Sequence, residues 1–423
     1  MSRPSPIRRS ISPLSDFLGT ESAGGAVLLA ATVLALVWAN SPWHGAYESL
    51  WSTVVGAEPF GLHLRMDLGH WVNDALMTIF FLVVGLEIKR EVTSGHLASR
   101  GAIGLPFSAA FGGMVVPAAI YLLVAGRVAP TGWGIPMATD IALALAALAV
   151  FGRSLPSGAR AMLLGIAVID DIGAIIVIAM FYSDGLNAAW LCVAAAAMGS
   201  AVVMARRGTQ SIVGVAPVGA LLWLALHEAG VHATLAGVSM GLLAPTTSRR
   251  RTTMVDSEDR DRPSALGSVS VVEWLLHHLH PWSAYAVLPV FALANAGVPL
   301  GRDDLASAAG SSVTWAVAMG LAVGKPLGVV LGAWLAIRLG VTRLPDGVGW
   351  RGMLAVGGAA GIGFTVALFV SDLAFDAEQW RRDATVGILS ASLLSAIVCG
   401  TAASAVRPLS TRPRWRSRRH WSR

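Results

Sequence analysis

Long apolar runs recur along nearly the whole chain, and they restrict its fold more than any other feature. Runs of 18 or more apolar residues begin near residue 24 and continue into the C-terminal region. Such a run crosses the hydrocarbon core of a bilayer as one helix, because lipid-exposed backbone must bond to itself. Of the 423 residues, 55% are hydrophobic and 13% are charged, a balance outside the range of ordinary globular domains. The sequence therefore predicts an all-α polytopic membrane protein.

About twelve transmembrane helices can be assigned to this pattern. Residues 1–17 are expected to form a cytoplasmic N-terminal segment, residues 18–406 a single membrane domain, and residues 407–423 a basic cytoplasmic tail. The seventh and eighth spans are short and share one hydrophobic block. The expected spans lie near residues 18–39, 69–88, 103–126, 132–151, 161–182, 187–205, 212–226, 230–244, 271–297, 312–338, 352–374 and 384–406.

Basic residues concentrate in the even-numbered connections, which places both termini in the cytoplasm by the positive-inside rule. Arg381 and Arg382, before the twelfth span, go against this trend. The tail carries seven arginines and no acid directly after the last span, an arrangement that favours anionic lipid over nucleic acid as its partner. The even connections contain Lys89, Arg90, Arg100, Arg153, Arg160, Arg206, Arg207, Arg249, Arg250, Arg251, Arg338 and Arg343.

Two of the expected spans look discontinuous. The fourth carries Gly134 and Pro136 just before the polar pair Thr139 and Asp140, and the eleventh carries the glycine-rich stretch GGAAGIGFT. Glycines also serve tight helix packing, so the eleventh span alone would not decide the matter. Spans 3–5 and 10–12, however, run in opposite directions, each with its interruption in the middle member. Inverted-topology repeats with matched discontinuous helices are typical of secondary transporters whose binding site lies at mid-membrane.

The fifth span contains two adjacent acids, Asp170 and Asp171, in a run over residues 161–182 whose only other ionisable side chain is the terminal tyrosine. Each carboxylate near the bilayer centre costs roughly 2.5–3.5 kcal/mol on insertion scales. Neighbours on a helix project about 100° apart, so we expect both to edge one water-filled cavity without facing the same side chain. Their oxygens suit either protons or a hard cation such as Na⁺ or Li⁺, and the two acids should titrate as a coupled pair.

Asp140 and Lys325 are the other ionisable residues deep in the spans. Lys325 is expected to neutralise one carboxylate, which leaves the others unexplained by structural pairing. Asp140 begins a half-helix, where a carboxylate can satisfy the helix dipole, and the residues alone leave this role and direct cation contact equally open. The two cysteines, Cys192 and Cys399, form no metal-binding motif.

The chain closely resembles the NhaA family of sodium/proton antiporters, over nearly its whole length. The resemblance implies electrogenic exchange of Na⁺ or Li⁺ for H⁺ in the bacterial inner membrane, regulation of intracellular pH and sodium, no cofactor, and a homodimer formed through residues 42–68. That connection also contains the alternating stretch FGLHLRM, which favours a small hairpin. The matching stretches are ESAGGAVLLA, NDALMTIFFLVVGLEIKRE, ATDIALAL, AVIDDIGAI, GVHATLAGV, LHPWSAYAVLPVFALANAGV, GKPLG and GIGFT.

Motif by motif, the resemblance assigns roles to single residues. It implies that Asp170 and Asp171 bind the cation and exchange protons, that Lys325 pairs with the first of them, and that Thr139 and Asp140 lie where the two broken helices cross. It further implies control by pH from the cytoplasmic side, through Glu87, Arg90, Glu91 and His232.

One departure from the family pattern concerns that control by pH. Where relatives carry a glutamate four residues before the histidine of LHPW, this chain has Leu276 before His280. Glu273 lies one helical turn earlier and is a candidate substitute, because residues three apart share a helix face.

Three other function classes can be weighed against exchange. The stretch HEAGVH places His227 and His232 five residues apart, out of register for the zinc site of a metalloprotease, and an aspartyl protease uses acids from two separate helices. Enzyme activity is therefore not expected. A cation symporter or a channel of similar architecture remains the alternative.

Overall fold

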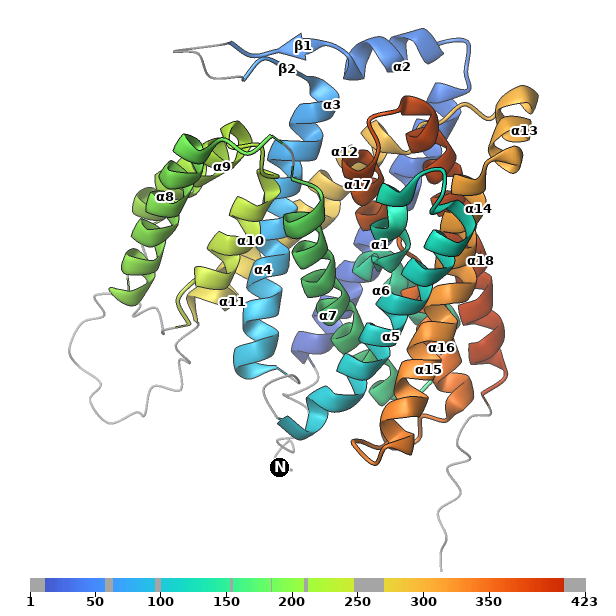
Figure 1. Ribbon diagram of the computed structural model, residues 1–423. Coiled ribbons are helices and arrows are strands. Elements are labelled where there is room, and N and C mark those ends of the chain that lie inside the picture. Colours follow the sequence, from blue (N-terminus) through green and yellow to red (C-terminus); the bar gives the residue numbers. More distant parts are fainter. Residues whose placement is uncertain are drawn as a thin grey trace, which may run out of the picture.

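The computed structural model describes residues 12–57, 64–95, 100–152, 155–183, 185–208, 212–246 and 270–406. Within these ranges the chain is a helical bundle with one two-stranded antiparallel pair at one end (Figure 1). The predicted basic tail, residues 407–423, and residues 1–11 of the predicted N-terminal segment lie outside the described ranges.

Six helices in the described part of the chain are long and apolar enough to cross a membrane, and up to nine if each bent helix pair counts as one span. Four are continuous α-helices: α5 (Arg100–Ala125), α7 (Ser157–Phe181), α8 (Ala188–Arg206) and α18 (Glu378–Ser404). The chain is thus a multi-pass membrane protein. Two shorter apolar helices, α9 (Ile212–Glu228) and α10 (Thr234–Leu243), occupy the seventh and eighth expected spans.

Three further long helices are interrupted by single π-helical turns. The turn η3 (Val72–Leu76) joins α3 (Leu68–Trp71) to α4 (Met77–Ser94), and η7 (Gly320–Gly324) joins α14 (Ser312–Met319) to α15 (Lys325–Arg338). A third turn, η6 (Ser283–Val287), joins α11 (Val271–Trp282) to α12 (Leu288–Asn295). Such turns often mark functional positions in a helix.

A bent helix pair lies in each of the two expected spans that look discontinuous in the sequence. The 3-10 helix η5 (Pro130–Met137) and α6 (Ile141–Phe151) meet at an angle of 44°, and α16 (Trp350–Ala360) and α17 (Phe364–Ala374) meet at 48°. Pro136 removes a backbone donor just before the first break. Gly361 and Gly363 flank the second, where an added Cβ would lie 2.7 Å from the Leu321 carbonyl oxygen or 2.9 Å from that of Ala138.

The first and last long helices differ from the predicted bounds. α1 (Ser12–Ala39) begins six residues before residue 18, and α18 begins at Glu378, six before residue 384. The extra turn of α18 is polar, and an ion pair of 2.5 Å between Glu378 Oε1 and Arg382 Nη2, one turn apart, supports it. Hydropathy alone does not detect such polar helical ends.

The two strands form the hairpin that the connection 42–68 was expected to contain. β1 (Val54–Val55) pairs with β2 (Met66–Asp67) so that Val54 faces Asp67 and Val55 faces Met66. The hairpin and α2 (His44–Trp51), which is bent by 115° from α1, lie across the end of the bundle opposite to the start of α1 (Figure 1). We call this the hairpin end; α13 (Arg302–Gly310) lies beside it, and the other end is the basal end.

Helices α5 and α15, in the third and tenth expected spans, are held in backbone contact by glycines. A Cβ on Gly112 would lie 2.2 Å from the Gly328 carbonyl oxygen, and a Cβ on Gly328 equally close to that of Gly112. Gly332 meets the Ser108 carbonyl oxygen at 2.0 Å in the same way. This reciprocal contact lets α5 cross α15, the helix that begins at Lys325, without a layer of side chains between their backbones.

Replacing Gly328 by alanine should separate these helices, since the added carbon has no space against backbone. We expect the free energy of unfolding to fall by roughly 1–3 kcal/mol, the usual cost of overpacking. Gly199 on α8 is the matched control because nothing lies within 4 Å of its Cβ position; alanine there should raise helix stability by about 0.5–1 kcal/mol. Thermal unfolding of both variants in detergent measures the difference, and equal stabilities would show that the contact is not tight.

Candidate functional site

The two breaks cross at the centre of the bundle and are joined by backbone contacts. The Asp140 amide donates to the Ile362 carbonyl at 2.7 Å, and the Thr139 hydroxyl lies 2.9 Å from the Ala360 carbonyl oxygen. Extended backbone at Ala138 and Asp140 exposes these groups. Each break therefore satisfies peptide groups of the other, which non-helical backbone within a membrane requires.

Asp140 caps the N-termini of both half-helices. Its Oδ1 accepts from the Leu143 amide of α6 at 3.0 Å, while Oδ2 accepts from the Thr365 amide of α17 at 3.0 Å and from the Thr365 hydroxyl at 2.6 Å. A carboxylate at these positions satisfies free N–H groups and complements both helix dipoles. Of the two roles left open by the sequence, this geometry supports the structural one.

Asp170 forms the ion pair with Lys325 that the family resemblance implied. The Lys325 ammonium lies 2.7 Å from Asp170 Oδ2, and both side chains are 0% exposed. The Lys325 ammonium also donates to the Met137 carbonyl, and the Thr139 hydroxyl lies 2.8 Å from the same Asp170 oxygen. Hydrogen bonds thus join the Asp170–Lys325 pair to Met137 at the end of η5 and to Thr139 in the first break.

Asp171 has different surroundings. No hydrogen bond or ion pair joins its carboxylate to another described residue, and it lines a cavity of ≈ 40 Å³ together with Thr139, Asp140 and Thr365. A water molecule needs only about 10–15 Å³ of such space, so the cavity accommodates a few waters or a partly hydrated ion. Of the two adjacent acids only Asp171 lines this cavity, contrary to the expectation that both would edge it.

The reason for this difference is the helical projection of neighbouring residues. With side chains about 100° apart, one acid turns to Lys325 and the crossing while the other turns to the cavity. Asp170 Oδ1 is buried and has no hydrogen-bond partner among the described residues. The unsatisfied acceptors of the site are therefore this oxygen and the Asp171 carboxylate.

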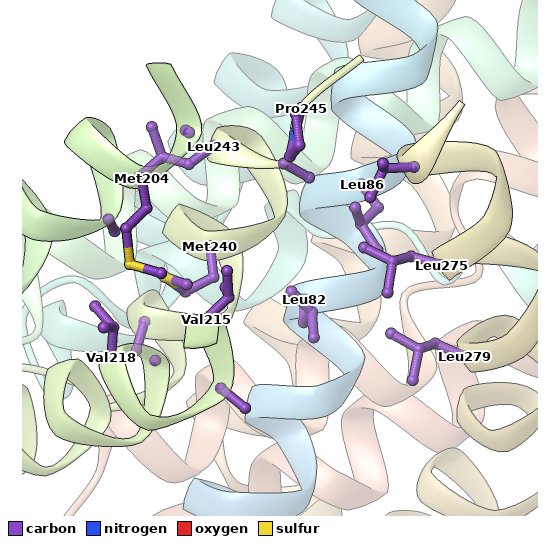
Figure 2. A pocket seen from close by; sticks show the side chains of 18 of the residues that line it. Leu82, Leu86, Met204, Val215, Val218, Met240, Leu243, Pro245, Leu275 and Leu279 are labelled. Carbon is purple, nitrogen blue, oxygen red and sulfur yellow. The ribbon is translucent and has the colours of Figure 1, made fainter. Parts of the chain in front are cut away.

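A second, larger pocket differs in chemistry from the Asp171 cavity. A cavity of ≈ 390 Å³ lies between α4, α8, α9, α10 and α11, and the side chains that surround it, such as Leu82, Met240 and Leu275, are almost entirely carbon (Figure 2). A hard cation needs oxygen ligands, which this lining does not supply. The small cavity at Asp171 does.

Two ionisable residues lie on the basal side of the cavity. Glu87 of α4 and His280 of α11 both line it, with 3.6 Å between Glu87 Oε1 and His280 Nε2. Sequence reasoning named Glu87 but used His280 only as a landmark of the LHPW motif. The indication available in the sequence was a histidine directly before Pro281, a proline inside an apolar span. Arg90 and Glu91 follow further along α4, and Glu91 is buried.

His232 lies apart from these residues. Its Nε2 contacts the Tyr182 carbonyl just after α7, toward the hairpin end. The Tyr182 hydroxyl in turn donates to the Thr131 carbonyl of η5 at 2.7 Å. Of the four residues implied in control by pH, Glu87, Arg90 and Glu91 therefore lie on α4. The fourth, His232, lies toward the hairpin end, beside Tyr182, which follows α7.

Glu273 does not replace the missing glutamate. It is exposed and forms a capping box with Ser270 at the start of α11, whereas Leu276 packs into an apolar cluster with Val83 and Leu86. The Glu273 carboxylate is bound at the N-terminus of α11. This residue therefore brings no carboxylate to the cavity, although Glu273 and Leu276 share a helix face.

Comparison with known proteins shows the family of the chain. The family profile described as "Na+/H+ antiporter 1" matches residues 15–402. The chain belongs to this antiporter family. Proteins named Na(+)/H(+) antiporter NhaA 2 from Sorangium cellulosum (strain So ce56) and Na(+)/H(+) antiporter NhaA from Rhodopirellula baltica are each 43% identical to it. Those alignments cover 95% and 93% of this chain and 90% and 93% of the relatives.

A solved structure shares the fold of this antiporter family member. The sodium proton antiporter MjNhaP1 from Methanocaldococcus jannaschii, determined at pH 8, matches with a TM-score of 0.51 over 94% of this chain and 99% of that one. At 13% identity this likeness concerns the fold alone.

Removing the Asp140 carboxylate should weaken both half-helices. Loss of an N-cap costs about 0.5–2 kcal/mol, so Asp140→Ala should lower the free energy of unfolding by roughly 1–4 kcal/mol for two caps. Asp140→Asn keeps one acceptor oxygen and should lose less. Thermal unfolding followed by tryptophan fluorescence ranks the variants, and an alanine variant as stable as the wild type would exclude the capping role.

Removing the Lys325 ammonium should destabilise the protein more strongly. Lys325→Ala leaves the fully buried Asp170 without a counter-charge, which typically costs roughly 3–5 kcal/mol. Lys325→Arg retains the charge, but its wider guanidinium must fit where the lysine stem packs beside Gly113. Unfolding temperatures should therefore follow the order lysine, arginine, alanine. A Lys325→Leu variant of wild-type stability would contradict the proposed importance of the pair.

Proposed function

We propose that this chain is an electrogenic antiporter that exports Na⁺, or Li⁺, in exchange for a larger number of H⁺, and so regulates intracellular pH and sodium. The observation that carries the proposal is the Asp171 carboxylate, which faces a small cavity beside the two broken helices and has no hydrogen-bond or ion-pair partner among the described residues. Family membership and relatives named Na(+)/H(+) antiporters support the same exchange.

The charges of the site explain how one set of oxygens serves both ions. Among the described residues the site contains three buried carboxyl groups, of Asp140, Asp170 and Asp171, and one buried ammonium, that of Lys325, which is paired with Asp170. The Asp140 oxygens are occupied by helix N–H groups, and one Asp170 oxygen is occupied by Lys325. A proton or a sodium ion that binds Asp171 compensates the remaining charge, and each excludes the other. Competition of this kind, combined with access from alternating sides, produces exchange.

The architecture proposed for this mechanism has about twelve transmembrane helices. Spans 3–5 and 10–12 form inverted repeats, and the reciprocal glycine contact between α5 and α15 supports that relation. In the proposed orientation both termini are cytoplasmic in the bacterial inner membrane, so the cavity and Glu87 face the cytoplasm. We also propose a homodimer formed through the hairpin-end connection.

Control by pH is proposed to involve Glu87, Arg90, Glu91 and His232, to which we add His280. Its contact with Glu87 beside the cavity supports this addition, because histidine titrates in the physiological range. With Leu276 in place of the usual acid, the activation profile is expected to depend on the His280–Glu87 pair.

The alternatives are less well supported by the geometry. A protease would need a water-activating site, but His227 lies 3.5 Å from Asp74, whereas His232 contacts the Tyr182 carbonyl, so the two histidines have different partners. A cation symporter of similar fold would use the same oxygens but would move both ions in one direction.

Exchange by purified protein in vesicles tests the proposal. Na⁺ added to acid-loaded proteoliposomes should collapse the pH gradient, and Asp171→Asn and Asp170→Asn should each abolish this response. The control is Asp303→Asn on the exposed helix α13, which removes an acid outside the membrane. A membrane potential set with valinomycin should change the rate if exchange is electrogenic.

Calorimetry on the same proteins separates competition from simple binding. Sodium uptake should release protons, and its affinity should weaken as pH falls. Undiminished transport by the Asp171 variant, or co-directional movement of Na⁺ and H⁺, would overturn the proposal.

A further inference from the structure

Three segments that surround the Asp171 cavity present the same order of residues toward the hairpin end. On α17, Thr365 and Val366 line the cavity, Phe369 follows one turn later, and Asp372 follows Phe369. From η6 into α12, cavity-lining Leu288 is followed by Phe291 and then Asn295.

The α4 segment repeats this order in the reverse chain direction. Phe80 lines the cavity, Phe81 is buried beside it, and Asn73 lies two turns earlier in η3, nearer the hairpin end. The three phenylalanines and the three polar residues therefore form two layers between the cavity and the hairpin end.

The inner layer is aromatic and closely packed. The Phe369 ring lies 5.2 Å from that of Phe81 and 6.4 Å from that of Phe291, measured between ring centroids. All three side chains are buried. This layer offers no oxygen ligand, so an ion that crossed it would have to keep its water ligands.

The outer layer is a continuous set of hydrogen bonds. Asn73 donates to Asp372 Oδ2 at 2.7 Å, and Asn295 donates to Asn73 Oδ1 at 2.8 Å. Arg381 at the start of α18 donates to the other Asp372 oxygen at 3.0 Å. We call these four residues the hairpin-end clasp.

The two oxygens of the Asp372 carboxylate bind different parts of the structure. Its ion pair with Arg381 joins α17 to α18, which follow each other directly in one inverted triplet. Its hydrogen bond with Asn73 joins that triplet to η3, which lies outside both triplets. Arg381 can therefore hold the carboxylate in position while the contact with Asn73 breaks and re-forms.

The cavity has its ionisable lining on the basal side of these layers. Glu87 and His280 are displaced toward the basal end from Phe81 and Phe291 along their own segments. Since α17 also carries Thr365, which binds Asp140, a shift of α17 at the clasp changes the geometry of the site.

We propose that Asn73, Asn295, Asp372 and Arg381 form the closure of the hairpin-end route to Asp171, with Asp372 as the positioning residue, and that the Asn73–Asp372 contact must open once in every transport cycle. This inference rests on the proposed exchange function. It assigns a role in alternating access to four residues that contact neither the cavity nor Lys325.

Reversible cross-linking tests the closure directly. In a background with Cys192→Ser and Cys399→Ser, the double variant Asn73→Cys with Asp372→Cys is joined by a short bifunctional methanethiosulfonate reagent in proteoliposomes. Exchange should fall at least tenfold on cross-linking and recover when the link is reduced. Recovery in the same sample excludes misfolding, and full exchange in the cross-linked protein would overturn the proposal.

Accessibility gives a second readout. A Val366→Cys reporter in the cavity should react with an impermeant thiol reagent from the basal side only, and Asn73→Ala should raise its reaction rate from the hairpin side at least tenfold. Gln379→Ala, an exposed change beside Arg381, is the control and should leave the hairpin-side rate unchanged. An unchanged hairpin-side rate in Asn73→Ala would contradict the closure.

The two proposals fail in different ways. If cross-linked protein still exchanges while Asp171→Asn does not, the clasp is wrong and the exchange site stands. If Asp171→Asn exchanges normally, the proposed function is wrong whatever the clasp does.

Discussion

The double capping by Asp140 is the interaction on which the rest of the site depends. The half-helices α6 and α17 begin inside the bundle, and their first N–H groups have no partner within the helix. One carboxylate accepts from both half-helices, through Leu143 on one side and Thr365 on the other. Because the same carboxylate binds both, it holds the two breaks together beside the cavity.

The adjacent acids divide the electrostatic work. Asp170 neutralises Lys325, so that the ammonium, which also donates to the Met137 carbonyl, is not an isolated buried charge. Asp171 is left to the cavity. A single carboxylate could not do both, since a side chain bound to a fixed ammonium has little affinity for a second cation.

Several of these features could be predicted from the sequence. Pro136 and the glycines of GGAAGIGFT identify both breaks, because proline and glycine act locally on the backbone. The scarcity of deep charges identifies Asp170, Asp171 and Lys325. The double cap, the separation of the two acids and the position of His280 could not be predicted, because each depends on contacts between distant segments. Asp140 and Thr365 are 225 residues apart, and Asn73 and Asp372 are 299 apart. No local periodicity reports such approaches.

The Thr139 hydroxyl has a further consequence. It carries a single hydrogen but lies within bonding distance of two acceptors, an Asp170 oxygen at 2.8 Å and the Ala360 carbonyl at 2.9 Å. Rotation about one carbon–oxygen bond transfers that hydrogen between a charged group and a peptide group. The vibrational frequency of an isotope-labelled Ala360 carbonyl therefore reports whether the Thr139 hydroxyl donates to Ala360 or to Asp170.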